Sequence, residues 1–373
     1  MELRDSPWVD GPGRTILESA GRINPERYGN FIGAFCRRNS TENPFLKAGF
    51  QKKLKIFRID ESCSYDPTII LQIRCLIKKE NINIIHTHEV RSDIVGLISG
   101  KVCRIPVVAT LHGWIENGFK GKIFTKLDKT ILRFFDHVIC VSERMKEEVL
   151  PLGIKEEKVS VLHNALVIDN FRRNLEDRSF RREIGAGEET LLVGNIGRFS
   201  PEKGQADFVL AASAVLKKHK DARFVLIGKG NDEARLRELA QDLGIRNEII
   251  FAGYRTNMVN VYNSLDLVVQ SSYTEGMPNV ILETLAMEVP VIATDVGGTS
   301  EAVTDNETGI LIQPGKPEEM AARILDFVKD KDAFQRMAEK GRKVIEAKFS
   351  IDERTKKLSK IYDRLIYEKR KSA

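Results

Sequence analysis

Residues 191–213 read LLVGNIGRFSPEKGQADFVLAAS. The first six, Leu191–Ile196, are almost continuously apolar, as expected of a strand that is buried on both faces of a sheet. The residues from Ala206 onward have the apolar spacing of a helix. The glycines between the two segments allow a close approach of the backbone to a ligand. A strand, a glycine loop and a helix in this order predict one unit of a parallel sheet with crossover helices.

The same alternation continues in both directions along the chain. Further apolar runs of strand length are found at Val107–Leu111, His137–Val141, Arg223–Ile227, Glu248–Phe251, Leu267–Gln270 and Val289–Thr294. Segments with helical spacing separate them, such as Ala206–Lys218 and Asp232–Leu243. The pattern runs twice and is interrupted by a polar, arginine-rich segment between about residues 165 and 189. We therefore predict an α/β protein with domains at 1–168 and 169–349 and a final helix at 350–373.

The first residues fit this pattern less well. Residues 10–17, DGPGRTIL, resemble a glycine turn from a strand to a helix, with Gly11 and Gly13 in the turn. A strand should precede such a turn, but Met1–Arg4 is short and polar for a central strand. We therefore expect the first strand to be only partly present, or the chain to begin later than its relatives do.

Length and composition are those of a globular protein with two domains. The chain has 373 residues, of which 42% are apolar and 30% charged. We find no apolar run of the roughly 18 residues that a transmembrane helix needs, and no secretory signal. The five cysteines are odd in number and none are spaced as CxxC. We expect no disulfide framework and no zinc site, and a cytoplasmic location.

The positive charge is concentrated in the first half. Residues 1–166 hold 26 Lys and Arg against 20 Asp and Glu, whereas the remainder holds 33 of each kind. Such an excess favours an anionic membrane surface, nucleic acid or a charged substrate, or is ordinary solubilising charge. The chain lacks a basic-plus-aromatic motif, so we expect no nucleic-acid partner.

One helical segment of this half, Lys120–Phe135, is both basic and amphipathic. Its apolar stripe consists of Ile123, Leu127, Ile131 and Phe134, and its cations are Lys122, Lys126, Lys129 and Arg133. The segment either packs its stripe on a sheet and exposes its lysines, or lies on an anionic membrane. The second alternative predicts a protein that is peripheral on the inner face of the membrane.

Candidate ligand-binding residues follow two of the predicted strands. Gly197, Arg198 and Lys203 come after Leu191–Ile196, at the end of a strand where doubly wound sheets bind ligands. Their two cations could neutralise a diphosphate, or could be solvated charges on an ordinary turn. Gly228, in Gly-Lys-Gly after the next strand, is a weaker signal that close backbone packing would also explain.

Residues 274–283, TEGMPNVILE, form the clearest of these motifs. Pro278 suits a first helical turn, which places Glu275 in the loop and Glu283 in the helix. Carboxylates there can accept hydrogen bonds from sugar hydroxyls, and the helix N-terminus attracts phosphate. A surface glutamate and a helix-stabilising glutamate would have the same spacing.

Together these motifs resemble family 4 of the retaining glycosyltransferases, over about residues 11–349. The family's Gly-Arg-x4-Lys-Gly motif matches residues 197–204, and its Glu-Gly-x-Pro-x4-Glu motif matches residues 275–283. Residues 136–143, 290–298 and 309–311 are also similar to the family. Ala165 departs from the pattern, because the family usually has glycine after the asparagine at this turn.

The resemblance implies the GT-B fold, in which two Rossmann-like doubly wound domains face each other across a cleft and the C-terminal helix crosses back to the first domain. It implies that Arg198 and Lys203 bind the donor diphosphate, that Glu283 binds the ribose and that Glu275 contacts the transferred sugar. His112 matches the active-site histidine of the first domain. The rest of the implied donor site consists of Gly11, Gly13, Gly197, Gly228, Gly276, Met277, Pro278 and Asn279. No metal or other cofactor is implied.

On this basis we expect a retaining transfer of a hexose or related sugar to a saccharide or a lipid-linked acceptor, in polysaccharide or glycan biosynthesis. A UDP-sugar is the favoured donor and GDP-mannose the next. The acceptor hydroxyl would attack from the face that the diphosphate leaves, with the leaving phosphate oxygen as base. Two alternatives stay open: a non-catalytic nucleotide-sugar-binding or assembly partner, and a nucleotide-sugar epimerase of the same fold.

His86 and His88 form a separate feature at the end of an apolar run. We expect their side chains to point to opposite faces, which disfavours a shared metal. A structural or acceptor-side role is the alternative that we prefer for them.

Overall fold

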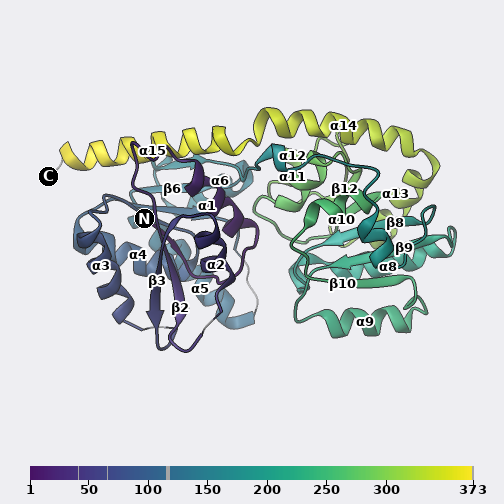
Figure 1. Ribbon diagram of the computed structural model, residues 1–373, viewed down its shortest axis with the longest axis horizontal. Coiled ribbons are helices and arrows are strands. Elements are labelled where there is room, and N and C mark those ends of the chain that lie inside the picture. Colours follow the sequence, from purple (N-terminus) through teal and green to yellow (C-terminus); the bar gives the residue numbers. More distant parts are fainter. Residues whose placement is uncertain (41, 65, 115–117, 372–373) are drawn as a thin grey trace. The chain divides into compact units, whose positions relative to one another are not determined.

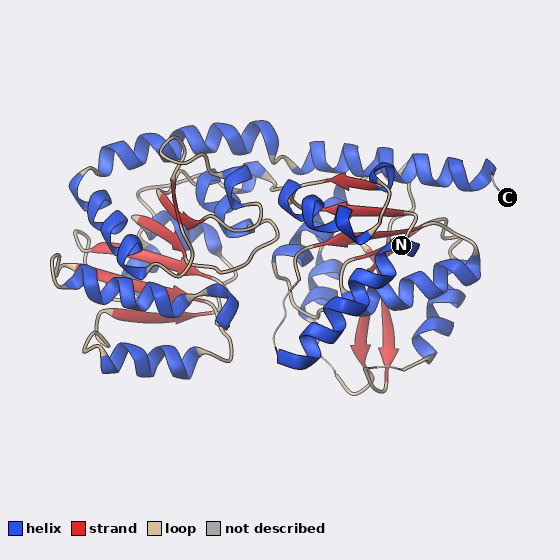
Figure 2. Ribbon diagram, turned by 180° about the vertical axis from the view of Figure 1, so that it is seen from behind, coloured by secondary structure: helices blue, strands red, loops and turns tan. Residues whose placement is uncertain are grey.

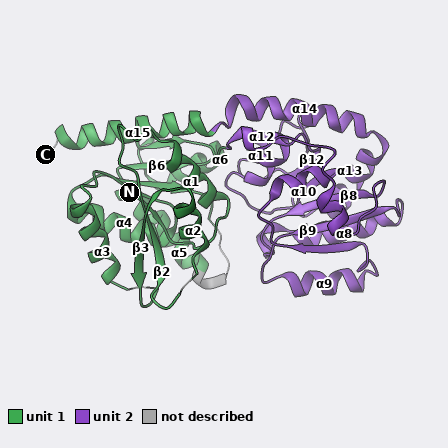
Figure 3. Cartoon of the chain, viewed as in Figure 1, with its two compact units in different colours: residues 1–165, 351–373 green, residues 166–350 purple. Residues whose placement is uncertain are grey.

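The computed structural model describes residues 1–40, 42–64, 66–114 and 118–371, with the side chains of residues 118–120 left undescribed. The chain divides into two units (Figure 3): residues 1–165 with 351–373, and residues 166–350. This division lies three residues before the boundary expected from the sequence. Each unit is an α/β layer structure, with helices against its own parallel sheet (Figures 1 and 2).

The first unit is built on a parallel sheet whose described strands have the order β3-β2-β1-β4-β5-β6-β7. The strands are β1 (Glu2–Arg4), β2 (Phe31–Arg37), β3 (Lys55–Glu61), β4 (Ile85–Thr87), β5 (Val107–Leu111), β6 (His137–Cys140) and β7 (Val159–Val161). Its helices are α1 (Gly11–Arg22), α2 (Pro44–Gln51), α3 (Thr68–Lys79), α4 (Val90–Cys103), α5 (Gly118–Ile131), α6 (Glu143–Val149) and α15 (Ile351–Lys371).

The second unit repeats this plan, with the strand order β10-β9-β8-β11-β12-β13 among the described residues. The strands are β8 (Leu191–Ile196), β9 (Ala222–Ile227), β10 (Ile249–Gly253), β11 (Leu267–Gln270), β12 (Val291–Thr294) and β13 (Ile310–Ile312). Its helices are α7 (Ser179–Glu183), α8 (Gln205–Leu216), α9 (Glu233–Asp242), α10 (Met258–Ser264), α11 (Asn279–Ala286), α12 (Thr299–Ala302), α13 (Pro317–Lys329) and α14 (Lys331–Lys348). The expected pair of Rossmann-like sheets is confirmed.

Strand β8 shows why its apolar run predicted a central strand. Leu191 and Val193 pack into the core on one face of the sheet, and Leu192 packs into the core on the other. Successive side chains of a strand alternate between the two faces, so a strand covered by helices on both sides must be apolar at every position.

Strand β1, of three residues, occupies a central position in spite of its polarity. It pairs with β2 on one side and β4 on the other, and is therefore central in the sheet. Its polar side chains are buried but partnered: Glu2 lies against His88, and Arg4 pairs with Asp10 and Glu89. Buried charges are tolerated when each has a partner, which is the reason that a polar strand can occupy this position.

The final helix, α15, packs on the first unit, as expected. Leu358, Tyr362 and Leu365 join a core cluster with Val108 and Ile139 of β5 and β6. Between Tyr362 and Leu365, Arg364 contacts the ring of His137, with 3.0 Å between Nη2 and Nδ1. The helix thus packs against the sheet through both apolar and polar contacts.

His137 makes the stability of this packing depend on pH. Burial, with help from the charge of Arg364, lowers its pKa from 6.5 to about 4. Above pH 6.5 the ring is neutral in both states, and its stabilising effect is complete; as pH falls from 6.5 toward 4, only the unfolded chain takes up the proton. Relative to His137→Asn, we expect the native protein to lose about 2 kcal/mol of unfolding free energy between pH 7.5 and pH 5. Urea unfolding of both proteins measures this difference, and a difference that does not change with pH would contradict it.

Candidate active site

In the second unit, the predicted site residues lie where the strand order reverses. The order β10-β9-β8 runs one way along the sheet and β11-β12-β13 runs the other, so the reversal falls between β8 and β11. Doubly wound sheets bind ligands in the crevice outside the carboxyl ends of the strands at such a point. The loop after β8 carries Gly197, Arg198 and Lys203, and the loop after β11 carries Glu275.

Lys203 and Glu275 form an ion pair between these two loops. Lys203 Nζ lies 2.6 Å from Glu275 Oε1. The same carboxylate oxygen accepts hydrogen bonds from Ser272 Oγ at 2.7 Å and Gln270 Nε2 at 3.3 Å. Both side chains are largely buried, with 25% and 12% exposed. The fold therefore brings together the predicted diphosphate cation and the predicted sugar-contacting carboxylate.

Arg198 has a different environment. Its Nη2 donates to Glu202 Oε1 at 2.7 Å, and Ser200 Oγ donates to the same oxygen. The Arg198 side chain is 57% exposed, so an anion can reach the guanidinium. Both predicted cations have a carboxylate partner, but the side chain of Lys203 is largely buried whereas that of Arg198 is exposed.

Two glycines let the loops of this unit approach each other closely. Gly204 has φ +61°, and a Cβ there would lie 2.1 Å from the backbone oxygen of Ser271. Gly228 has φ +148°, and a Cβ there would lie 1.8 Å from the backbone oxygen of Gly197. A side chain cannot be placed at either position without moving backbone. The alternative of close backbone packing at Gly228 is thus realised.

Glu283 lies in α11, as expected, and is buried. Its Oε2 accepts a hydrogen bond from Tyr262 Oη at 2.9 Å. Pro278 is the N-cap of this helix, one position before the expected first turn, and Asn279 is the first helical residue. The neighbouring Met277 is buried, and the backbone oxygen of Gly276 accepts from the Gly298 amide at 2.7 Å.

In the first unit, the reversal of strand order falls between β1 and β4. Gly11 and Gly13 follow β1, but they form the first turn of α1 and not a loop ahead of it. Asp10 caps this helix, because its Oδ1 accepts from the Gly13 amide at 3.0 Å. The same oxygen accepts from Arg4 Nη2 at 2.6 Å. The Gly13 amide is thus occupied by the Asp10 carboxylate in this structure, and the phosphate contact of the two glycines stays a prediction.

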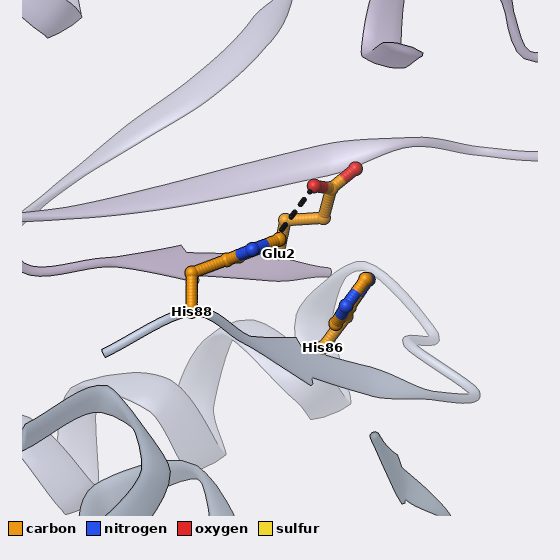
Figure 4. A group of neighbouring side chains, drawn as sticks. All are labelled: Glu2, His86 and His88. Atoms are coloured by element: carbon orange, nitrogen blue, oxygen red, sulfur yellow. Dashed lines mark hydrogen bonds and ion pairs between the residues drawn. The ribbon is translucent and has the colours of Figure 1, made fainter. Parts of the chain in front are cut away.

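His112 lies at the end of β5 and belongs to a buried network. Its Nε2 is 3.2 Å from Nδ1 of His88, and Nε2 of His88 is 3.1 Å from Glu2 Oε2. His86, drawn with Glu2 and His88 in Figure 4, lies 2.6 Å from Tyr362 Oη through Nδ1 and 2.6 Å from Thr110 Oγ1 through Nε2. Burial is the main cause that lowers the pKa of all three histidines well below 6.5. The three rings are therefore neutral near pH 7.

The expectation that His86 and His88 point to opposite faces is wrong. Their ring centroids are 4.4 Å apart. Residues two apart in an extended segment share a face, because only immediate neighbours alternate.

Glu2, His86 and His88 are the one group in the described part of the chain whose ligand atoms are close enough to hold a metal, within 4.8 Å of one another. Every ring nitrogen of the two histidines already has a hydrogen-bonding neighbour. The positive charges of Arg4 and Arg354 also act on His88, after burial, to lower its pKa. These features fit a hydrogen-bonded network better than a cation site.

Sequence reasoning gave no site role to Glu2, Arg4, Asp10 or Glu89. Two of their pairings join distant parts of the chain: Glu2 with His88, which are 86 residues apart, and Arg4 with Glu89. The available signal was two charged residues in a run ahead of a glycine turn, which we interpreted as a poor strand.

Two family models match the chain in succession. Residues 27–170 match the model described as Glycosyltransferase Family 4, and residues 176–344 match the model described as Glycosyl transferases group 1.

Individual proteins of known sequence or structure are also similar. An uncharacterised glycosyltransferase of Methanocaldococcus jannaschii is 29% identical over 331 residues, which cover 85% of this chain and 79% of that protein. The UDP-Gal:alpha-D-GlcNAc-diphosphoundecaprenol alpha-1,3-galactosyltransferase of Escherichia coli is 25% identical over 97% of this chain and 96% of its own length. The structure of Anabaena HepE in complex with UDP-glucose aligns with a TM-score of 0.85 at 21% identity, covering 98% of this chain and all of that one.

Proposed function

Since this chain belongs to family 4 of the glycosyltransferases, which act on nucleotide sugars, we propose that it is a retaining enzyme that transfers a hexose or related sugar to a saccharide or lipid-linked acceptor. The observation that carries the proposal is the Lys203–Glu275 pair at the strand-order reversal of the second unit. A cation and a carboxylate held together there suit a ligand with a diphosphate and a sugar.

In the proposed reaction, the acceptor oxygen forms a bond to the anomeric carbon while the bond from that carbon to the diphosphate breaks. The acceptor proton passes to the leaving phosphate oxygen on the same face of the sugar. Lys203 and Arg198 stabilise the negative charge that develops on the diphosphate. Glu275 contacts the sugar and Glu283 the ribose, and the turn that holds Gly11 and Gly13 lies near the phosphates. The protein supplies no covalent nucleophile and, in this proposal, no metal.

We favour a UDP-sugar as the donor and a lipid-linked saccharide as the acceptor. The E. coli relative is named for UDP-galactose and a diphosphoundecaprenol acceptor, and the HepE structure contains UDP-glucose. A GDP-sugar is the second candidate for the donor.

A thermal-shift screen with UDP, GDP, ADP and their sugars tests the donor site. A nucleotide at 100 times its Kd should stabilise the protein by about 2.7 kcal/mol. We expect stabilisation by UDP and its sugars, and its loss in Lys203→Ala and Glu283→Ala. Stabilisation that survives both substitutions would place the nucleotide elsewhere. A nucleotide sugar that binds but is never consumed with any acceptor would favour the non-catalytic alternative.

We also propose that α5 and the short helix after it, Leu132–Phe134, contact an anionic membrane surface. The expected alternative was that the apolar stripe packs on the sheet. Ile131 of this stripe is partly buried, but Ile123, Leu127 and Phe134 are 50%, 41% and 57% exposed. The segment instead buries Thr125, Asp128 and Leu132. Exposed apolar side chains among Lys122, Lys126 and Arg133 suit insertion between acidic headgroups. Among the described residues, no helix has the length and apolarity to cross a bilayer.

Flotation with phosphatidylglycerol-containing vesicles at low salt tests this contact. We expect the protein to float with them and the triple variant Ile123→Ser, Leu127→Ser, Phe134→Ser to lose most of this binding. Leu71→Ser, which removes an equally exposed leucine from α3, is the matched control and should float normally. Equal flotation of native and triple-variant protein would contradict the proposal.

A further inference from the structure

Three residues from neighbouring strands form a chain of hydrogen-bonding contacts in the first unit. Glu2 lies in β1, His88 follows β4 and His112 follows β5, and these strands are adjacent in the sheet. Glu2 Oε2 lies 3.1 Å from His88 Nε2, and His88 Nδ1 lies 3.2 Å from His112 Nε2. The chain ends at His112 Nδ1, which is buried and has no hydrogen-bond partner.

The direction of the protons in this chain follows from its first member. An ionised carboxylate can only accept hydrogen bonds, so Nε2 of His88 must carry the proton. The ring of His88 is neutral, so its Nδ1 is a lone pair that can only accept. Nε2 of His112 must then be the donor, which leaves Nδ1 of His112 as an unprotonated, unpartnered acceptor.

Several other groups act on these rings. The charges of Arg4 and Arg354 add to burial in lowering the pKa of both His88 and His112, which keeps the rings neutral. The two ring nitrogens of His86 are held by Tyr362 and Thr110, and the ring centroid of His86 lies 4.4 Å from that of His88. A buried acceptor without a donor destabilises the structure until a donor reaches it.

We propose that Glu2 and His88 are positioning residues that hold His112 as the Nε2–H tautomer, so that its Nδ1 accepts a hydrogen bond from a hydroxyl of the sugar substrate. This inference rests on the proposed glycosyltransferase function for the identity of the ligand. It assigns to Nδ1 of His112 the role of a hydrogen-bond acceptor toward the substrate, and it excludes proton donation to the substrate from that atom. The partner atom is a hydroxyl oxygen, because a nitrogen lone pair cannot accept a hydrogen bond from an ionised phosphate or carboxylate oxygen.

Nitrogen-15 NMR of the histidine-labelled protein reads the tautomer directly, and the chain has only six histidines to assign by substitution. We expect His112 to carry its proton on Nε2 and to keep a lone pair on Nδ1 at pH 7. A proton on Nδ1, or a doubly protonated ring, overturns the proposal. This measurement needs no turnover, so it decides the tautomer even if every nucleotide sugar proves inert and the proposed function fails.

A pair of substitutions at His88 tests its effect on the reaction. His88→Asn keeps an acceptor oxygen for His112 Nε2–H, whereas His88→Leu keeps the bulk and removes it. With whichever of UDP-glucose, UDP-galactose and GDP-mannose is turned over, we expect His88→Leu to lower kcat by about 10- to 100-fold and His88→Asn to recover most of it. The tautomer of His112 should become mixed in His88→Leu alone. The proposal is overturned if the native protein and both His88 variants have equal kcat values. It is also overturned if the native protein binds stoichiometric zinc and both His88 variants lose this zinc.

Discussion

Replacing Lys203 with methionine is expected to lower kcat/KM for the nucleotide sugar by about 10²- to 10³-fold. Methionine keeps most of the length of the side chain and removes the ammonium. The charge that this ammonium would balance grows as the diphosphate leaves, so the loss should fall on kcat more than on KM. The carboxylate of Glu275, which is 12% exposed, would keep only neutral partners in Ser272 and Gln270.

Two further variants separate charge from folding. Lys203→Arg keeps a cation and should recover part of the activity, although its planar group cannot reproduce the geometry of an ammonium. Lys220→Met removes an exposed cation of the same unit and should leave kcat/KM unchanged. Steady-state kinetics and urea unfolding on all three variants complete the comparison. If Lys203→Met changed only the unfolding free energy, Lys203 would be a structural partner of Glu275 and not a donor contact.

The buried strands could be predicted because their signal is local. Val107–Leu111, Leu191–Ile196 and Leu267–Gln270 were expected at the bounds that β5, β8 and β11 have in the structure. Each is apolar on both faces, and no information from distant residues is needed to recognise that pattern. Strand β12 begins two residues later than expected, at Val291, directly after a proline that cannot donate to a neighbouring strand.

The polar parts of the first unit could not be predicted in this way. Glu2 and Arg4 have the polarity of an edge or a loop, and their place at the centre of the sheet depends on His88 and Glu89. Such partners are 80 or more residues away and are chosen by the topology, which a window of neighbouring residues does not contain.

The orientation of α5 was open for a similar reason. Its apolar stripe suggested a buried face, but the structure buries the face that carries Asp128, whose Oδ2 accepts from Trp114 Nε1 at 2.9 Å. Trp114 gives one of the two buried carboxylate oxygens a donor, so hydrophobic spacing alone did not fix which side of the helix faces the protein.

In the candidate site, the sequence predicted the residue types and the loops that carry them. It did not predict that Lys203 and Glu275 form an ion pair. The spacing of the two motifs placed Lys203 and Glu275 after separate strands, and only the sheet order brings those strands together. Asn195 and Ser271 complete the connection: Asn195 Nδ2 donates to Ser271 Oγ at 3.0 Å, and that hydroxyl donates to the Lys203 backbone oxygen at 2.9 Å. The two loops are therefore fixed to each other before any ligand binds.

This connection explains why Gly204→Ala is expected to be severe. Gly204 and Gly244 have nearly the same left-handed backbone, with φ +61° and +69°. A Cβ on Gly244 would meet nothing within 4 Å, whereas a Cβ on Gly204 would lie 2.1 Å from the Ser271 backbone oxygen. Alanine should therefore cost about 1–2 kcal/mol of unfolding free energy at Gly244, from backbone strain alone. At Gly204 the overlap should raise the cost to roughly 2–5 kcal/mol.

The two alanine variants also differ in what they should do to the site. To admit a Cβ at Gly204, the loop after β11 must move away from the loop after β8, and this separates the partners of the Lys203–Glu275 pair. Gly204→Ala should therefore weaken binding of UDP even at temperatures where the variant is fully folded, while Gly244→Ala should bind UDP normally. Calorimetric titration with UDP, together with urea unfolding, measures both effects. Equal unfolding free energies for the two variants would mean that the loops are free to separate, and the ion pair could then not be a preformed part of the donor site.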